Sequence, residues 1–420
     1  MAYFVYCRRM ANEIIKTNVC IIGAGPSGAT TSLFLAKQKI PHVIVDTAVF
    51  PRDKVCGDGL DLKVLRVLNH LDPSVVEREI INNDNFIKAW GCSIIISKNK
   101  RHDLGIDKSK ASDKDYPFFL VSKRAYFDNF LVSKIDPAYA DFRQGMKVKK
   151  LTREGDEWRI SAQQNSTEIE IHAKMIVGAD GDHSAVLRSL GERKIDRQHY
   201  GGALRQYWKG ISGIHPNQHL EIYLPKTLPL AYFWIFPLPN GEANVGCGLV
   251  SEYIAKQSLD LKKLFHQLIT EDPALAERFK NATPLEKPVG WGLPLASQRR
   301  SASGDGYLLI GDAAALVCPT TGEGIGPGMM SGYIAAHYVQ RAVNENRYDK
   351  TRFANYDREI NRRLQSDIKK YNLLRKVNPR LYNSIINFLS EVGVAGYYFN
   401  KHVNNWITTA KKGKIEIDMN

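Results

Sequence analysis

An apolar run that leads directly into a glycine pattern restricts the fold of this chain more than any other feature. Residues 19–22 precede the pattern Gly23-x-Gly25-x-x-Gly28, and a short apolar run in this position predicts a buried parallel strand. Gly23 allows a tight turn, Gly25 allows the backbone to approach a pyrophosphate, and Gly28 allows the next helix to pack closely on the sheet. That helix is expected over residues 27–39.

A second apolar strand follows the expected helix and ends in a carboxylate. Residues 42–45 precede Asp46, which stands at the distance from the glycines where a ribose hydroxyl needs an acidic partner. The N-terminus of the helix offers unpaired N–H groups to phosphates. The order of these elements predicts a dinucleotide site, with these cofactor-binding residues: Gly23, Gly25, Pro26, Ser27, Gly28 and Asp46.

The rest of the pattern predicts an interleaved chain without internal repeats or low-complexity linkers. With 420 residues and 44% hydrophobic content, the chain can bury a large core in two domains or in one interrupted domain. Strand and helix alternate at first, as in a doubly wound sheet. A hairpin is expected with strands over 158–162 and 167–171, followed by a separate short strand over 174–178. A long helix is expected from near Pro327.

The composition indicates the cellular compartment of the protein and whether a metal site is expected. No apolar run approaches the roughly 18 residues of a membrane-spanning helix, and the first residues lack the long apolar stretch of a secretory signal. The cysteines, at positions 7, 20, 56, 92, 247 and 318, have neither the spacing of a disulfide scaffold nor that of a zinc site. We therefore expect a cytoplasmic protein without a metal site.

The net charge of +14 is concentrated towards the C-terminus. Residues 346–420 contain 15 Lys and Arg against 7 Asp and Glu, a net charge of +8. Charge runs of this kind usually form a solvated helical surface. The alternative is peripheral contact with the inner face of an anionic membrane, which apolar stretches at 371–374 and 385–389 would support. Nucleic acid is not expected as a partner, because no nucleic-acid-binding motif is found.

Three motifs together resemble those of FAD-dependent oxidoreductases of the p-hydroxybenzoate hydroxylase-like superfamily, over residues 19 to about 340. They are Gly23-x-Gly25-x-x-Gly28, Asp180-Gly181 and Gly311-Asp312. Two further motifs are similar to those of the geranylgeranyl reductases, namely Pro51-x-x-x-x-Cys56-Gly57 and Tyr232-x-Trp234-x-Phe236-Pro237. Flavin halogenases favour Trp-x-Trp-x-Ile-Pro in the last motif, and aromatic hydroxylases usually have a histidine where this chain has Ala315. Both of those branches fit less well.

The resemblance implies an α/β fold in which a Rossmann-type FAD-binding domain is interleaved with a mostly antiparallel β substrate domain. A helical C-terminal region follows. The FAD-binding parts are expected at residues 1–88, 122–199 and 293–345, the substrate-domain parts at 89–121 and 200–292, and the helical region at 346–420.

The resemblance also implies further contacts to FAD. Asp312 would accept hydrogen bonds from ribityl or ribose hydroxyls, although such an aspartate can also cap a helix. The helix that follows Gly322 and Gly324 would direct its N-terminus at the flavin and stabilise negative charge on the reduced ring. The cofactor-binding set therefore gains these residues: Arg52, Cys56, Gly57, Arg124, Asp180, Gly181, Gly311, Asp312, Gly322, Gly324 and Ile325. Arg52 and Arg124 could instead be solvated cations, and a helix cap would also explain Asp180.

The resemblance places Cys56 beside the flavin ring, where its thiol could donate a proton, shape the pocket or bond to another cysteine. A free cysteine is more often an inert apolar residue. Alternation along 232–237 directs Tyr232, Trp234 and Phe236 to one face of the sheet. With Trp291 they are expected to line an apolar substrate tunnel, the alternative being an ordinary hydrophobic core.

The catalytic candidates are Cys56, Tyr232 and Trp234. Cys56 or Tyr232 would supply the proton, and aromatic faces would stabilise a developing cation.

The expected function is the FAD-dependent reduction of carbon–carbon double bonds in a geranylgeranyl or other prenyl chain or prenyl lipid. NAD(P)H or a protein electron carrier would reduce the FAD, and the substrate would be an apolar small molecule or lipid. One alternative is an FAD-dependent monooxygenase or halogenase, in which reduced FAD meets oxygen. Another is a flavin electron-transfer protein that passes electrons to a quinone or a protein partner.

Overall fold

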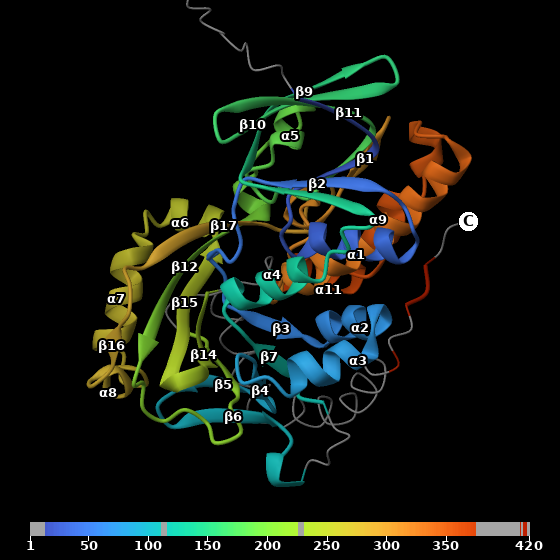
Figure 1. Cartoon of the computed structure of the whole chain (residues 1–420). Helices are drawn as coiled ribbons and strands as arrows, with labels where there is room; N and C mark the ends of the chain where they lie inside the picture. Colours follow the sequence, from blue (N-terminus) through green and yellow to red (C-terminus); the bar gives the residue numbers. More distant parts are fainter. Residues whose placement is uncertain (1–12, 111–115, 226–230, 375–411, 413–414, 418–420) are drawn as a thin grey trace, which may run out of the picture.

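Two eight-stranded sheets of different character organise the chain (Figure 1). The computed structural model describes residues 13–110, 116–225, 231–374, 412 and 415–417. Strands of the first sheet come from widely separated parts of the chain, between Glu13 and Leu309, and strands of the second come from residues between Gly91 and Pro294. The chain therefore passes between the two sheets several times, as an interleaved fold requires.

The first sheet is mainly parallel along its central path, which has the order β18-β19-β11-β1-β2-β8. Strand β1 lies between β11 and β2, and both neighbours run parallel to it. The strands of this sheet are β1 (Glu13–Ile22), β2 (His42–Asp46), β8 (Ala140–Gln144), β9 (Met146–Glu154), β10 (Glu157–Gln164), β11 (Thr167–Gly178), β18 (Ser303–Gly304) and β19 (Tyr307–Leu309). The C-terminal half of β1 is buried because sheet neighbours and helix α1 (Pro26–Lys37) cover it.

One detail of the sequence prediction was wrong in this sheet. The strands expected over 167–171 and 174–178 are both parts of β11, a single strand of 12 residues. Its first half pairs antiparallel with β10, and it also pairs parallel with β1 as far as Gly178. No turn separates the two segments, because the strand that completes the hairpin continues directly into the central sheet.

The second sheet is mostly antiparallel, with the order β16-β12-β15-β14-β13-β5-β6 and with β17 paired to β12. Only the pairing of β13 with β5 is parallel among the strand pairs described for this sheet. Its strands are β5 (Gly91–Ser97), β6 (Lys100–Gly105), β12 (Tyr200–Lys209), β13 (Leu220–Tyr223), β14 (Tyr232–Leu238), β15 (Glu242–Val250), β16 (Thr283–Pro284) and β17 (Val289–Pro294). Helices α6 (Ser251–Lys256), α7 (Leu261–Glu271) and α8 (Ala276–Phe279) lie along its outer side in Figure 1.

The remaining elements connect and cover the sheets. A small antiparallel sheet has the order β3-β7-β4, formed by β3 (Gly59–Asp61), β4 (Ile87–Ala89) and β7 (Phe119–Val121). The other helices are α2 (Leu62–Leu71), α3 (Pro73–Val76), α4 (Arg124–Ser133), α5 (Ala185–Ser189), α9 (Ile325–Glu345), α10 (Tyr356–Arg362) and α11 (Gln365–Leu374). One-turn helices include the π-helix η1 (Glu77–Ile81) and the 3₁₀ helices η2 (Lys108–Lys110), η3 (Arg197–His199), η4 (Pro239–Gly241), η5 (Gly311–Ala314) and η6 (Lys350–Phe353).

These elements confirm the expected α/β fold class. The long helix α9 begins at Ile325, two residues before the expected Pro327. Within the part of the C-terminal region that the structure describes, α10 and α11 are helical. The stretch at 385–389 lies outside the described residues. No helix in the described ranges is long and apolar enough to cross a membrane.

Candidate functional site

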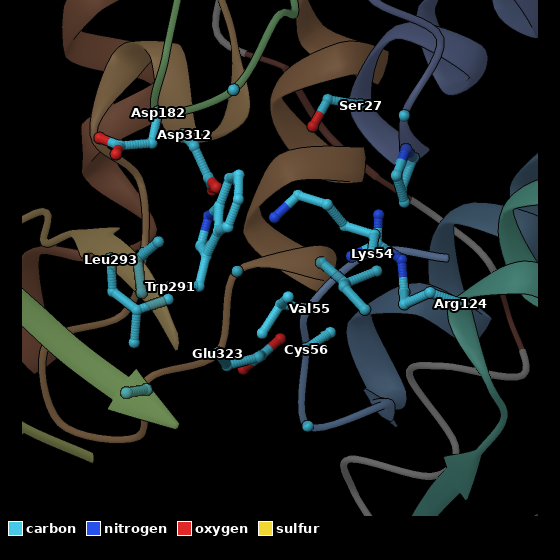
Figure 2. Close-up of a pocket in the computed structure, with 18 of the residues that line it drawn as sticks. Ser27, Lys54, Val55, Cys56, Arg124, Asp182, Trp291, Leu293, Asp312 and Glu323 are labelled. Carbon is cyan, nitrogen blue, oxygen red and sulfur yellow. The ribbon is translucent and has the colours of Figure 1, made fainter. Parts of the chain in front are cut away.

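One cavity of about 660 Å³ is lined by residues from both large sheets (Figure 2). All of the cofactor, catalytic and substrate residues expected from the sequence line it, except Gly28 and Gly311. Residues more than 200 positions apart in the chain therefore face a common space.

Backbone conformation shapes the cavity around the start of α1. Gly23 has a φ of +102°, and a Cβ there would lie 2.4 Å from the carbonyl oxygen of Ala179. Gly25 caps α1 without a side-chain hydrogen bond, so the first N–H groups of the helix remain available to an anion. Asp46 accepts hydrogen bonds from the N–H of Ala24 at 2.6 Å and of Ala48 at 2.8 Å, which hold its carboxylate at the end of β2.

The two glycines outside the cavity wall serve close packing. A Cβ at Gly28 would lie 1.9 Å from the carbonyl oxygen of Gly23, so only glycine lets α1 begin there. A Cβ at Gly311 would lie 2.4 Å from Oγ of Ser27. Gly28 and Gly311 therefore bring the lining segments together without lining the cavity themselves.

Asp180 caps a helix and also lines the cavity. Its Oδ2 accepts hydrogen bonds from the N–H of Ala185 at 2.6 Å and of Val186 at 3.2 Å, at the start of α5. Its Oδ1 is buried without a hydrogen-bond partner, and burial raises the pKa of this carboxyl. Helix capping therefore uses only one oxygen, and a ligand in the cavity can use the other.

Arg52 and Arg124 are held by a buried carboxylate that the sequence analysis did not single out. Nη1 of Arg52 lies 2.6 Å from Oδ2 of Asp128, and Nε of Arg124 lies 2.6 Å from Oδ1 of the same residue. Burial lowers the pKa of Arg124, but the Asp128 carboxylate and Cys56 raise it more. Neither arginine is a freely solvated cation, because Asp128 fixes both beside the cavity.

Lys54 extends into the cavity towards Trp291, as Figure 2 shows. Its Nζ lies 3.4 Å from the centre of a Trp291 ring, the geometry of a cation–π contact. Burial, together with the nearby charge of Arg124, lowers the pKa of Lys54 to about 8. Burial raises the pKa of Asp312, although Lys54 and Arg124 oppose that shift. This part of the cavity therefore holds positive charge close to Asp312.

The aromatic wall of the cavity is formed by Tyr232, Trp234 and Phe236 of β14. Ring centres are 5.6 Å apart for Tyr232 and Trp234 and 6.2 Å apart for Trp234 and Phe236. The intervening Phe233 and Ile235 point to the other side, where they pack in the core beneath α7. The alternation of the strand thus separates the lining residues from the core residues.

A buried asparagine connects the aromatic wall to the loop that carries Cys56. Asn244 of β15 accepts a hydrogen bond from Nε1 of Trp234 at 2.9 Å. Its Nδ2 donates to the carbonyl oxygen of Cys56 at 2.7 Å and to Oδ2 of Asp58 at 2.8 Å. Tyr207 also donates to Asp58, at 2.7 Å. The two motifs that resemble geranylgeranyl reductases are therefore joined by a residue from outside both.

Asn244 was missed by sequence reasoning, although one signal was present. It is a polar residue in the otherwise mainly apolar run 243–250, and a buried polar side chain needs hydrogen-bond partners. The sequence does not identify those partners, because Cys56 and Trp234 lie 188 and 10 residues away.

A second set of lining residues was also missed. Nζ of Lys63 lies 2.8 Å from Oδ2 of Asp61 and 2.7 Å from Oε2 of Glu323. Asp61 caps α2 by accepting from the N–H of Lys63 at 2.9 Å, and Glu323 belongs to the loop before α9. Asp61 and Glu323 both line the cavity, and we call them the acid pair.

Asp103, His215 and His219 form a cluster away from the cavity whose potential ligand atoms lie within 4.8 Å of one another. Nδ1 of His215 accepts a hydrogen bond from the N–H of Asn217 at 3.1 Å, so its proton is on Nε2, the nitrogen nearer Asp103. That tautomer leaves no lone pair on Nε2 for a metal, and we assign no metal to this cluster.

FAD fits the cavity on structural grounds. The uncapped N-termini of α1 and α9, Gly23 with no room for a Cβ, and the unpartnered oxygen of Asp180 all face the space that the dinucleotide motifs surround. A family model described as an FAD-binding domain matches residues 16–212. Residues 16–212 thus form an FAD-binding domain, and FAD is the cofactor.

Individual relatives and solved structures are also similar to this chain. The chain is 29% identical over 333 residues to a menaquinone reductase of Mycobacterium tuberculosis, covering 77% of this chain and 76% of the relative. It is 25% identical to digeranylgeranylglycerophospholipid reductase 2 of Methanosphaera stadtmanae, covering 90% and 91% of the two chains. A geranylgeranyl bacteriochlorophyll reductase-like protein of Thermoplasma acidophilum has the same fold, with a TM-score of 0.76, 24% identity and coverage of 90% and 92%. These similarities confirm the resemblance to geranylgeranyl reductases that the motifs indicated.

Proposed function

We propose that this enzyme reduces carbon–carbon double bonds of a geranylgeranyl or other prenyl chain, carried by a lipid or by an apolar small molecule. The observation that carries the proposal is the shared cavity, in which the FAD-binding residues and the aromatic wall face one space. The names of two relatives, which specify a digeranylgeranyl glycerophospholipid and menaquinone, support the same substrate class.

Each group of lining residues has a distinct part in this reaction. FAD, when bound and reduced, supplies hydride. The N-terminus of α1 and the carboxylate of Asp46 bind the dinucleotide, while the N-terminus of α9 favours negative charge next to it. The aromatic wall binds an apolar chain, excludes water, and stabilises positive charge that develops on the substrate.

An acid must supply the proton that completes the reduction. Cys56 and Tyr232 are the acids indicated by the motifs. Burial raises the pKa of Tyr232 to about 12, so its hydroxyl keeps its proton at neutral pH and is a weak acid.

The deciding experiment reduces the flavin of the purified protein without oxygen and adds geranylgeranyl diphosphate or a prenyl-lipid extract. Flavin reoxidation is then followed together with the mass of the product. A gain of hydrogen pairs in the prenyl chain supports the proposal. Flavin that stays reduced until air enters supports a monooxygenase or halogenase instead. Menaquinone is added in a parallel reaction, where reoxidation without hydrogen gain in its side chain supports an electron-transfer protein.

We further propose that NAD(P)H or a protein electron carrier reduces the FAD, and that the basic C-terminal region contacts an anionic membrane from the cytoplasmic side. Anaerobic mixing with NADH or NADPH tests the first point through bleaching of the flavin absorbance. Co-sedimentation with anionic and with neutral lipid vesicles tests the second. Binding that is equal for both vesicle types would argue against an electrostatic contact.

A further inference from the structure

We propose that Glu323 is the proton donor for the reduction, and that the charges of Asp61 and Lys63 set its protonation state. This role rests on the proposed function, because it identifies the acid for that reaction. Glu323 lines the cavity and lies in the loop before α9, next to Gly322 and Gly324 (Figure 2). Neither the glycine motifs nor the aromatic motif assigns it a function.

The geometry of the acid pair favours a proton held between its two carboxyl groups. A Cβ at Gly326 would lie 2.3 Å from Oε1 of Glu323 and 2.6 Å from Oδ1 of Asp61, so the two carboxyl oxygens approach the same point. Oε1 of Glu323 is buried and has no donor group as a hydrogen-bond partner. Two ionised carboxylates repel each other at such a separation, and a shared proton removes the repulsion.

The charges around the pair indicate which residue holds the proton. Burial and the charge of Asp61 raise the pKa of Glu323 well above its usual range, although Lys63 opposes the shift. Burial also raises the pKa of Asp61, but Lys63 and its hydrogen bonds outweigh that and lower it. Asp61 is therefore the ionised member and Glu323 is the acid.

Other titratable groups near Glu323 come from three elements. Tyr232 of β14 is a neighbour, because a Cβ at Gly322 would lie 2.3 Å from its hydroxyl oxygen. Asp312 of η5 lies near Gly324, with its Oδ1 3.5 Å from the Cβ position there. Cys56 lies in the loop before β3 and lines the same cavity.

Glu323 is better suited to proton donation than the phenol of Tyr232. General acids work best when their pKa lies near the working pH, and the pKa of Tyr232 is about 12. The side chain of Lys63 is 41% exposed and bonds both members of the acid pair. It therefore holds its positive charge between the two carboxyl groups, where it favours ionisation of Asp61.

The proposed step balances atoms and electrons. The alkene receives hydride from the reduced flavin on one carbon, and the other carbon forms a C–H bond with the proton of Glu323. The O–H bond of Glu323 breaks and leaves its electron pair on the carboxylate, while the flavin is left oxidised. A proton from water restores the acid.

Replacement of Glu323 by glutamine tests the step directly, because it keeps the size of the side chain and removes the acid. We expect E323Q to retain FAD and to reoxidise reduced flavin with geranylgeranyl diphosphate at least about 100-fold more slowly than the wild type. The matched control is E242Q, which breaks another glutamate–lysine pair, Glu242 with Lys123 at 2.6 Å, outside the cavity lining. It should keep the wild-type rate.

Two further substitutions should move the pH profile in opposite directions. D61N removes a negative charge and so lowers the pKa of Glu323. Activity falls as rising pH ionises Glu323, so in D61N it should fall at a lower pH than in the wild type. Asparagine also caps helices well, so α2 should remain intact. K63M removes a positive charge and so raises the pKa of Glu323. In K63M the activity should therefore fall at a higher pH than in the wild type. A structural role alone would not give shifts of opposite sign.

An infrared measurement reports the proton without turnover. The C=O stretch of un-ionised Glu323 should appear at pH 7 as the difference between the spectra of the wild type and E323Q, and in D61N only at lower pH. An E323Q protein as active as the wild type, or an unchanged infrared band, would overturn the role of Glu323 alone. A wild type that transfers no hydrogen to a prenyl chain would overturn the proposed function and this role with it.

Discussion

The FAD side of the cavity is shaped mainly by the backbone, whereas the opposite wall is shaped by side chains. On the FAD side, a Cβ at Gly23 would collide with the backbone of Ala179, and Gly25 leaves the first N–H groups of α1 uncapped by a side chain. On the other side, Trp234 and Asp58 are held by hydrogen bonds to Asn244. The FAD side should therefore be altered most by adding atoms to a glycine, and the opposite wall by removing a hydrogen-bonding group.

The largest effect is expected from Gly23→Ala. The residue has a φ of +102°, and the added Cβ would lie 2.4 Å from the backbone of Ala179. The strained conformation alone costs about 1–2 kcal/mol, and the overlap with backbone adds to it. We expect loss of bound FAD, measured as flavin absorbance per protein after purification, and a lower melting temperature.

The control for this change is Gly155→Ala in the turn between β9 and β10. Gly155 has a φ of +58° and no atoms within 4 Å of a Cβ position, so the substitution adds strain without overlap. Equal flavin loss in both variants would show that strain alone, and not the approach to Ala179, explains the result.

A smaller but still large effect is expected from Asn244→Ala on the other wall. The substitution removes the partner of Trp234 Nε1, of the Cys56 carbonyl and of Asp58. Unpaired buried groups cost about 1–3 kcal/mol each, so we expect a loss of about 4 kcal/mol in the free energy of unfolding, measured by urea titration. FAD affinity should fall less than in Gly23→Ala.

Asn361→Ala serves as the comparison for that variant. Asn361 donates one partly buried hydrogen bond, to the carbonyl oxygen of Asp357 at 2.7 Å, and lies outside the cavity lining. A loss as large as that of Asn244→Ala would contradict the view that the cavity network is the source of the effect.

Asp58 makes the stability of the wall dependent on pH. Burial raises its pKa from 3.8 to about 6, although Asn244 and Tyr207 oppose the shift. Between these values the folded protein keeps a proton that the unfolded chain has released, so this group's contribution to stability falls as the pH rises. The fall is about 3 kcal/mol by pH 7, and Asp58→Asn should remove it. Urea titrations of both proteins between about pH 4 and pH 7 measure the difference, and parallel curves would refute it.

The smallest effect is expected from Trp291→Leu. The ring faces Nζ of Lys54 at 3.4 Å, and such a contact contributes about 1 kcal/mol. Its loss should lower the pKa of Lys54 further below its present value of about 8. NMR titration of reductively methylated lysines measures the shift. Phe130→Leu, beneath Lys134 at 5.6 Å, should give almost none.

The two sides of the cavity also differ in how far the sequence predicts them. The glycine motifs identify the FAD side because each motif is a local sequence pattern, although the close approach of Ala179 to Gly23 is not visible in it. The wall residues Tyr232, Trp234 and Phe236 could be predicted from strand alternation together with the family resemblance. Asn244 and the acid pair could not, because their contacts depend on which distant strands and loops meet in the folded chain.

The hydrogen bonds of Asn244 divide the aromatic wall into a fixed part and an exchangeable part. Trp234 shares the amide of Asn244 with the Cys56 loop, so trimming it to admit a bulkier substrate would also release that loop. Phe236 meets the loop only through its ring, 3.4 Å from the Cβ positions of Gly57 and Gly59. Redesign of the cavity for prenyl chains of other shapes should therefore begin at Phe236.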